Sequence, residues 1–120
     1  MKDSITKSKS FSFAVRIVKL YTYLCETKKE YVMSKQCLRS GTAIGAMVRE
    51  SESAQTRPDF IHKCSIAIKE ANETLYWLEL LAVTGFIEET PFESLKKDVE
   101  ELLKLLTSGI KTAKAKLNKV

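Results

Sequence analysis

The stretch that decides the fold is FIHKCSIAIKEANETLYWLELLAVTG, residues 60–85. Its apolar residues recur at alternating spacings of three and four, which is the heptad pattern of a helix packed in a bundle. Gly85 stands where a residue in the left-handed conformation commonly ends a helix. The pattern therefore predicts one long helix that ends just before Gly85. Its apolar positions are Ile61, Cys64, Ile68, Ala71, Leu75, Leu78 and Ala82.

A second heptad runs toward the C-terminus and begins with the clearest helix start in the chain. Thr90, Pro91 and Glu93 combine a threonine cap, a proline at the first helical position and a glutamate at the third. The sequence therefore predicts a last helix that starts after Thr90. Its apolar positions are Phe92, Leu95, Val99, Leu102, Leu106, Ile110, Ala113 and Leu117.

The N-terminal part predicts a helix that is apolar on more than one side. Residues 1–9 are polar and basic, and we expect them to be frayed, with Ser10 as the N-cap. From there two apolar stripes run side by side, one beginning at Phe11 and the other at Phe13. A helix with so wide an apolar surface is expected to pack on more than one neighbour.

The second helix is marked by a high density of small residues. Its start is ambiguous, because a capping box from Thr27 to Glu30 competes with Ser34. Gly41 and Gly45 then stand inside the helical pattern, where each glycine costs about 1 kcal/mol relative to alanine. We expect another backbone to approach closely there. The residues predicted to serve helix packing or oligomer contacts are Gly41, Gly45, Met47 and Trp77.

Length and composition agree with a single all-α domain. The 120 residues suffice for one core, and 44% hydrophobic with 29% charged residues is typical of a globular chain. Four glycines and two prolines are too few for the turns of a sandwich or barrel. We therefore predict an antiparallel up-down four-helix bundle over residues 10–120.

The sequence also favours a cytoplasmic protein without a membrane partner. No apolar run approaches the ~18 residues of a membrane span, and the N-terminus has no signal-peptide core. Cys25, Cys37 and Cys64 are odd in number and far apart, which favours buried thiols over a disulfide framework. Free thiols of this kind suit a reducing compartment.

Nothing in the sequence has the pattern of an active site or a metal site. His62 is the single histidine and lacks the glutamate three positions earlier that a di-iron bundle requires. Neither cysteines nor histidines stand at zinc-site spacing. Residues 40–45 hold two glycines but no lysine after the second, unlike a phosphate-binding loop. We therefore expect no catalytic residues, no metal, no cofactor and no enzymatic activity.

The charge of the chain is more informative about possible partners than these motifs are. The net charge is +5, and five lysines but no acidic residue follow Glu101. A basic balance favours RNA or DNA as a partner, although lysines near the end of a helix also complement its dipole. The candidates for phosphate contacts are Arg16, Lys19, Lys35, Arg39 and Arg49. The alternative for Arg39 and Arg49 is that they form ion pairs with Glu50, Glu52 or acidic residues of the third helix.

The middle of the chain resembles the four-helix-bundle proteins first noticed in intervening sequences of bacterial 23S ribosomal RNA genes. The resemblance covers roughly residues 10–86, and it rests on the order and spacing of several short pieces. These pieces are Gln36, Leu38-Arg39-Ser40, Thr42-Ala43-Ile44-Gly45-Ala46, Glu50, Asp59-Phe60-Ile61, Ala67 through Glu73, and Trp77-Leu78.

This resemblance implies a small antiparallel bundle that assembles into a homopentameric ring. A related branch, the accessory variability determinant of diversity-generating retroelements, partners a reverse transcriptase and binds nucleic acid. Two residues depart from the pattern: Met47 stands where the family usually has asparagine, and Arg49 where a small residue is common. A polar contact made by that asparagine is therefore absent from this chain.

Two classes of function follow. In the first, the protein is a non-enzymatic adaptor for RNA or DNA whose basic surfaces are repeated around an oligomer. In the second, it is a structural or protein-interaction oligomer without a nucleic-acid role. We expect self-association in both, because the first two helices carry more apolar surface than four helices cover.

Overall fold

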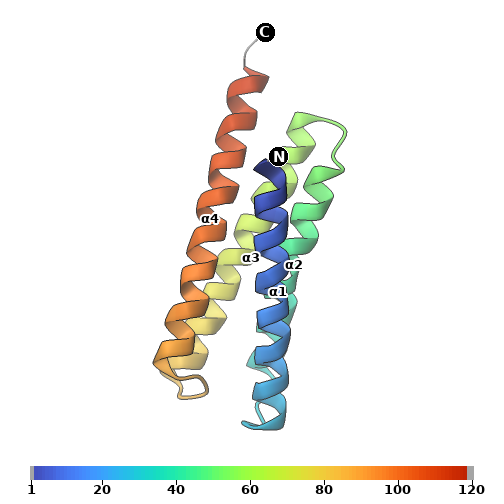
Figure 1. Ribbon diagram of the computed structural model, residues 1–120. Coiled ribbons are helices and arrows are strands. Elements are labelled where there is room, and N and C mark those ends of the chain that lie inside the picture. Colours follow the sequence, from blue (N-terminus) through green and yellow to red (C-terminus); the bar gives the residue numbers. More distant parts are fainter. Residues whose placement is uncertain (1, 119–120) are drawn as a thin grey trace.

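Four α-helices, each antiparallel to the next, make up the described part of the chain (Figure 1). A computed structural model describes residues 2–118 and contains no strand in that range. The helices are α1 (Lys2–Glu26), α2 (Met33–Glu52), α3 (Arg57–Val83) and α4 (Glu89–Leu117). They form a rod of 55 × 21 × 21 Å. The expected all-α four-helix fold is thus confirmed.

The start of α1 differs from the prediction. The helix begins at Lys2, so Ser10 is not its N-cap. Ser10 is buried inside the helix, and its hydroxyl donates to the carbonyl oxygen of Lys7 at 3.1 Å. The early turns are supported from the next helix, because Lys7 lies 3.9 Å from Glu52 at the end of α2. Tertiary contact therefore extends the helix beyond the local signal.

The start of α2 is held by an unexpected cap. Neither predicted cap, Thr27 or Ser34, caps α2. The side chain of Glu30, which precedes the helix, does so instead. Its carboxylate accepts hydrogen bonds from the backbone N–H groups of Val32, Met33 and Ser34 at 3.0, 3.0 and 2.7 Å. Glu30 thus accepts hydrogen bonds from backbone N–H groups at the start of α2, which, as in any helix, have no acceptor within the helix itself.

The α3 helix ends where the sequence predicts, just before Gly85, and it begins with a cap that was not predicted. The Thr56 hydroxyl accepts the N–H of Asp59 at 3.2 Å, and Pro58 stands in the first turn. Gly85 has a positive φ of 85°, and the next residue, Phe86, donates its N–H back to Leu81 at 2.9 Å. This is the Schellman arrangement that glycine permits after a helix.

The α4 helix begins one residue before Thr90, at Glu89, and its N-cap Glu88 makes no side-chain hydrogen bond. Thr90 is therefore not the cap. Pro91 still stands in the first turn, where its missing N–H leaves no intrahelical bond unmade. The predicted heptad is confirmed in its middle, whereas Leu117 is 43% exposed. The buried residues of α4 are Leu95, Val99, Leu102, Leu106 and Ala113.

The core uses a rotated face of α3. Three of the seven predicted positions are buried, and the other four, Ile61, Ile68, Leu75 and Ala82, are only partly buried. α3 packs against both α2 and α4, so the side that faces between those two helices is the buried one. That side also carries residues outside the predicted heptad. The buried residues of α3 are Cys64, Ala67, Ala71, Thr74, Leu78 and Leu81.

In α1, only one of the two apolar stripes enters the core. Phe13, Ile17 and Leu24 are at most 2% exposed. In the other stripe, Phe11 and Val18 are 55% and 47% exposed, whereas Ala14 and Tyr21 are partly buried. The single chain therefore leaves part of α1 as an apolar surface.

Candidate nucleic-acid interface

The five basic residues singled out in the sequence do not form one surface. Lys19, Lys35 and Arg49 are exposed, and none makes an ion pair within residues 2–118. Arg16 and Arg39 are instead held by acidic residues on two different neighbouring helices. The alternative of ion pairing with acids of the third helix therefore holds for Arg39, whereas the pair of Arg16 with Asp98 of α4 was not predicted.

Arg16 joins α1 to α4. Its Nη1 lies 2.6 Å from Asp98 Oδ2, and its Nη2 donates to Ser94 Oγ at 3.0 Å. Both halves of the planar guanidinium are thereby engaged, which is the geometry in which arginine binds most specifically. Because the α1–α4 contact is much less extensive than the other helix contacts, this pair is a principal link between the two helices.

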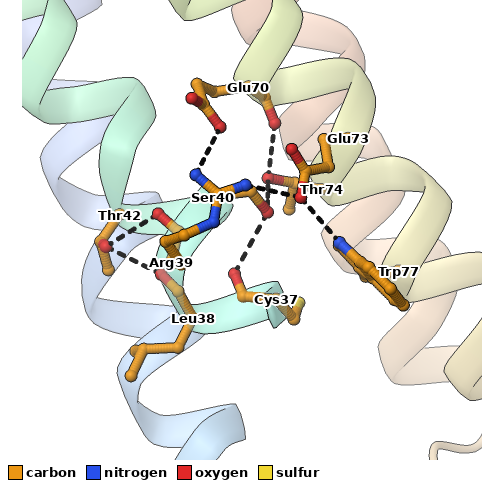
Figure 2. Close-up of polar contacts among 9 residues, drawn as sticks. All are labelled: Cys37, Leu38, Arg39, Ser40, Thr42, Glu70, Glu73, Thr74 and Trp77. Carbon is orange, nitrogen blue, oxygen red and sulfur yellow. Dashed lines mark hydrogen bonds and ion pairs between the residues drawn. The ribbon is translucent and has the colours of Figure 1, made fainter. Parts of the chain in front are cut away.

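Arg39 joins α2 to α3, as Figure 2 shows. Its Nη1 and Nη2 lie 3.3 and 2.6 Å from the carboxylates of Glu70 and Glu73, and Trp77 Nε1 donates to the same Glu73 oxygen at 3.0 Å. The hydrogen bond from Arg39, followed by that from Trp77, lowers the pKa of Glu73. The same bond raises the pKa of Arg39. The positive charge is thus compensated within the chain.

A buried hydroxyl pair lies beneath this ion pair (Figure 2). Thr74 and Ser40 are fully buried, and their hydroxyl oxygens are 2.9 Å apart. Thr74 also donates to the carbonyl oxygen of Glu70 at 2.8 Å. The sequence did not predict that either residue is buried, because a hydroxyl at a core position gives no periodic signal. Their small size and mutual hydrogen bond let α2 and α3 pack without an unsatisfied polar group.

The packing residues predicted on α2 lie against α1 and the core. A Cβ on Gly41 would stand 2.9 Å from both γ carbons of Ile17, and one on Gly45 would stand 3.4 Å from the backbone oxygen of Ser10. Met47 and Trp77 pack partly buried against the core. The expected approach of another backbone is therefore present at Gly45, whereas the close neighbour of Gly41 is the Ile17 side chain.

An outward apolar strip lies beside the α1–α2 contact. Phe11, Val15 and Val18 follow spacings of four and three along α1 and are 55%, 40% and 47% exposed. The guanidinium carbon of Arg49 lies 5.3 Å from the Phe11 ring centroid, a cation–π contact. We call Phe11, Val15 and Val18 the α1 strip.

Positive charge is concentrated at one end of the rod. This end, which we call the basic end, holds the start of α1, the end of α2, the start of α3 and the end of α4 (Figure 1). It comprises residues 5–14, 44–69 and 99–118, with ten basic and five acidic residues. The other half, residues 15–43 and 70–98, has eight basic and nine acidic residues.

The described residues have few groups suited to other chemistry. Within residues 2–118 no three His, Cys, Asp or Glu side chains gather as a possible metal site, and none of the four described helices is long and apolar enough to cross a membrane. Burial raises the pKa of Cys37 to about 12, so this thiol stays protonated. Cys64 is buried as well, whereas Cys25 is only partly buried.

Comparison with known proteins identifies the family. Residues 2–108 match the family described as 23S rRNA-intervening sequence protein. The chain belongs to this family. The match extends beyond the residues 10–86 that carried the resemblance and includes the early turns of α1. No curated protein matches the chain.

A solved structure supports membership in the 23S rRNA-intervening sequence protein family. It is a 1.70 Å crystal structure of a protein of unknown function from the S23 ribosomal protein family of Bacteroides thetaiotaomicron. This chain is 59% identical to it, with a TM-score of 0.91 over 92% of this chain and 99% of that one. The fold of the family member described here is therefore shared with an experimentally determined relative.

Proposed function

We propose that this protein is a non-enzymatic, oligomeric helical bundle that associates with nucleic acid, principally RNA, through its basic end. The observation that carries the proposal is the separation of charge: the basic end has a net charge of +5 and the other half a net charge of −1. A concentrated positive surface binds phosphates with release of counterions. Repetition of such an end in an oligomer would strengthen weak individual contacts.

The second half of α4 supplies the best phosphate-binding side chains of this end. Lys104, Lys111 and Lys114 are exposed and make no ion pair within residues 2–118. Lys104 and Lys111 are seven residues apart, so they share one face about 10 Å apart along the helix. Arg49 is the only one of the five originally predicted residues in this half. The proposed surface therefore moves from α1 and the start of α2 to the end of α4.

The test is binding to a labelled structured RNA across a salt series. We expect micromolar affinity that falls steeply with salt, and a Lys104→Gln/Lys111→Gln/Lys114→Gln variant that weakens binding. The slope of log K against log salt should fall by about 0.7 to 0.9 for each phosphate contact removed. A control variant, Lys28→Gln/Lys96→Gln/Lys97→Gln, makes the same charge change in the other half and should bind almost normally.

The second candidate function is a structural or protein-interaction oligomer, and the exposed α1 strip favours it. Absence of RNA binding at low salt, by protein that is folded and assembled, would select this candidate. Equal weakening by both triple variants would instead indicate nonspecific attraction to overall charge and would reject the basic end as the site.

A further inference from the structure

A cavity of about 830 Å³ opens at the basic end of the bundle. Its buried lining comes from Val48, Cys64, Leu106 and Ala113, with Ser51 as its one buried hydroxyl residue. Phe60 of α3 and Ile5 of α1 add apolar surface. Pockets of 300–1,000 Å³ with predominantly apolar walls are typical of sites for small ligands. The cavity is therefore large enough to admit a ligand between α1 and α4.

Small residues on α4 leave this space open. A Cβ added to Gly109 would meet only Phe60 Cζ, at 3.9 Å, which is an ordinary contact distance. Gly41, in contrast, is required because Ile17 is 2.9 Å from the same hypothetical atom. Glycine within a helix costs about 1 kcal/mol relative to alanine, and close packing does not account for that cost at Gly109. Its absent side chain instead enlarges the cavity.

The rim of the cavity is positively charged. Arg57 at the start of α3 and Lys116 at the end of α4 both line it and are exposed. Neither makes an ion pair within residues 2–118. The acidic residue of the lining, Glu52, lies 3.9 Å from Lys7 and is partly compensated by it. An anionic group at the rim would therefore meet two cations without a partner.

The interior offers little to a polar ligand. The buried hydroxyl of Ser51 already donates to the carbonyl oxygen of Val48 at 2.6 Å. Among the described residues, no buried side-chain nitrogen or oxygen lacks a hydrogen-bond partner. A nucleobase or sugar placed there would lose hydrogen bonds to water without replacement. An aliphatic chain makes no hydrogen bonds to water, so it loses none when it enters the cavity.

We propose that this cavity binds an amphiphile with one aliphatic chain and one anionic head group, of the class of medium- to long-chain carboxylates. The chain would lie along Val48, Cys64 and Leu106, and the carboxylate would lie between Arg57 and Lys116. The cavity shares the basic end with the proposed nucleic-acid surface, but it uses none of Lys104, Lys111 and Lys114, so variants of these three lysines distinguish the two proposals.

Titration calorimetry of the full chain with octanoate, decanoate and dodecanoate, each below its micelle concentration, tests the proposal. Affinity should tighten by up to about fourfold per added methylene, the factor expected for full burial of each group. Dodecyltrimethylammonium has the same chain length but a positive head, and we expect it to bind at least tenfold more weakly. No binding of dodecanoate, or equal binding of the two head groups, would overturn the proposal.

Two variants separate the cavity from other apolar surfaces. Gly109→Leu fills the cavity and should abolish dodecanoate binding while the helical circular dichroism remains. Arg57→Gln/Lys116→Gln changes only exposed residues, so it keeps the fold, and it should weaken dodecanoate binding about tenfold. Lys28→Gln/Lys97→Gln makes the same charge change in the other half and should have no effect. Unchanged binding in the Arg57→Gln/Lys116→Gln variant would reject the site even if Gly109→Leu fails to fold.

Discussion

The carboxylate of Glu30 is the only side-chain cap of α2, because the residue at the N-cap position, Val32, makes no side-chain hydrogen bond. Partial burial raises the pKa of Glu30, but hydrogen bonds from the N–H groups of Met33, Ser34 and Val32 outweigh it, and the pKa is lowered. The ionised form is therefore the one that the folded state prefers. Ionised carboxylates at a helix N-terminus also interact favourably with its dipole.

We predict that Glu30→Gln lowers the free energy of unfolding at pH 7 by about 1 kcal/mol, as removal of a helix cap usually does. Because the folded-state pKa is below the unfolded value of about 4.3, the stabilisation is present above that value and is lost as pH falls through the folded pKa. Urea unfolding of wild type and variant between pH 3 and 7 measures this difference, which should shrink toward the acidic end. Glu26→Gln, at the exposed end of α1, is the control, and an equal effect there would contradict the assignment.

At the scale of elements, the contact between α1 and α2 depends on small residues of α2. The side chain of Ile17 fills the space in front of Gly41 and is 1% exposed, so it has little freedom to move aside. Gly45 has slightly more room before the backbone of Ser10. The three glycines within described helices, Gly41, Gly45 and Gly109, therefore differ in the space before them.

We therefore predict that substitution by alanine has opposite effects on stability at Gly41 and at Gly109. Gly41→Ala should destabilise the fold by about 1–3 kcal/mol through overpacking against Ile17. Gly109→Ala should stabilise it by up to about 1 kcal/mol through helix propensity, and Gly45→Ala should lie between them. Urea midpoints of the three variants provide the measurement. The close-packing interpretation would fail if Gly41→Ala were as stable as Gly109→Ala.

The surface of a single chain has two features that the packing of its own helices does not require. These are the exposed α1 strip and the separation of charge between the two ends. Phe11, Val15 and Val18 form an apolar surface of the kind that commonly marks a protein interface. Oligomerisation would cover it, and five copies is the number that the family resemblance implies. The basic ends would then be repeated within one assembly.

We predict that the wild-type protein has a mass near 68 kDa in light scattering, five times the 13.6 kDa of one chain. Val15→Glu/Val18→Glu should reduce the mass toward that of one chain, because two carboxylates would have to be buried in the interface. Val32→Glu/Val83→Glu is the matched control, since these two valines are 74% and 85% exposed and lie outside the strip. A wild-type mass of 13.6 kDa would refute the assembly.

The sequence alone was sufficient for the four helices, for the left-handed Gly85 and for most of the buried face of α4. These features depend on periodicity and on local backbone chemistry, which are readable from neighbouring residues. The family, too, was recognisable from short pieces in order. The cost of a glycine inside a helix also indicated close packing at Gly41, although the neighbour there is the Ile17 side chain and not a backbone.

Which surfaces remain free to bind a partner could be determined only from the packing of the helices. Whether an arginine binds a ligand or an internal acid depends on residues far away in sequence, as Asp98 does for Arg16 and Glu73 for Arg39. The early turns of α1 and the rotated face of α3 likewise depend on neighbouring helices. The basic end and its cavity come from four separate segments, and antiparallel packing is what brings their charges and small residues together.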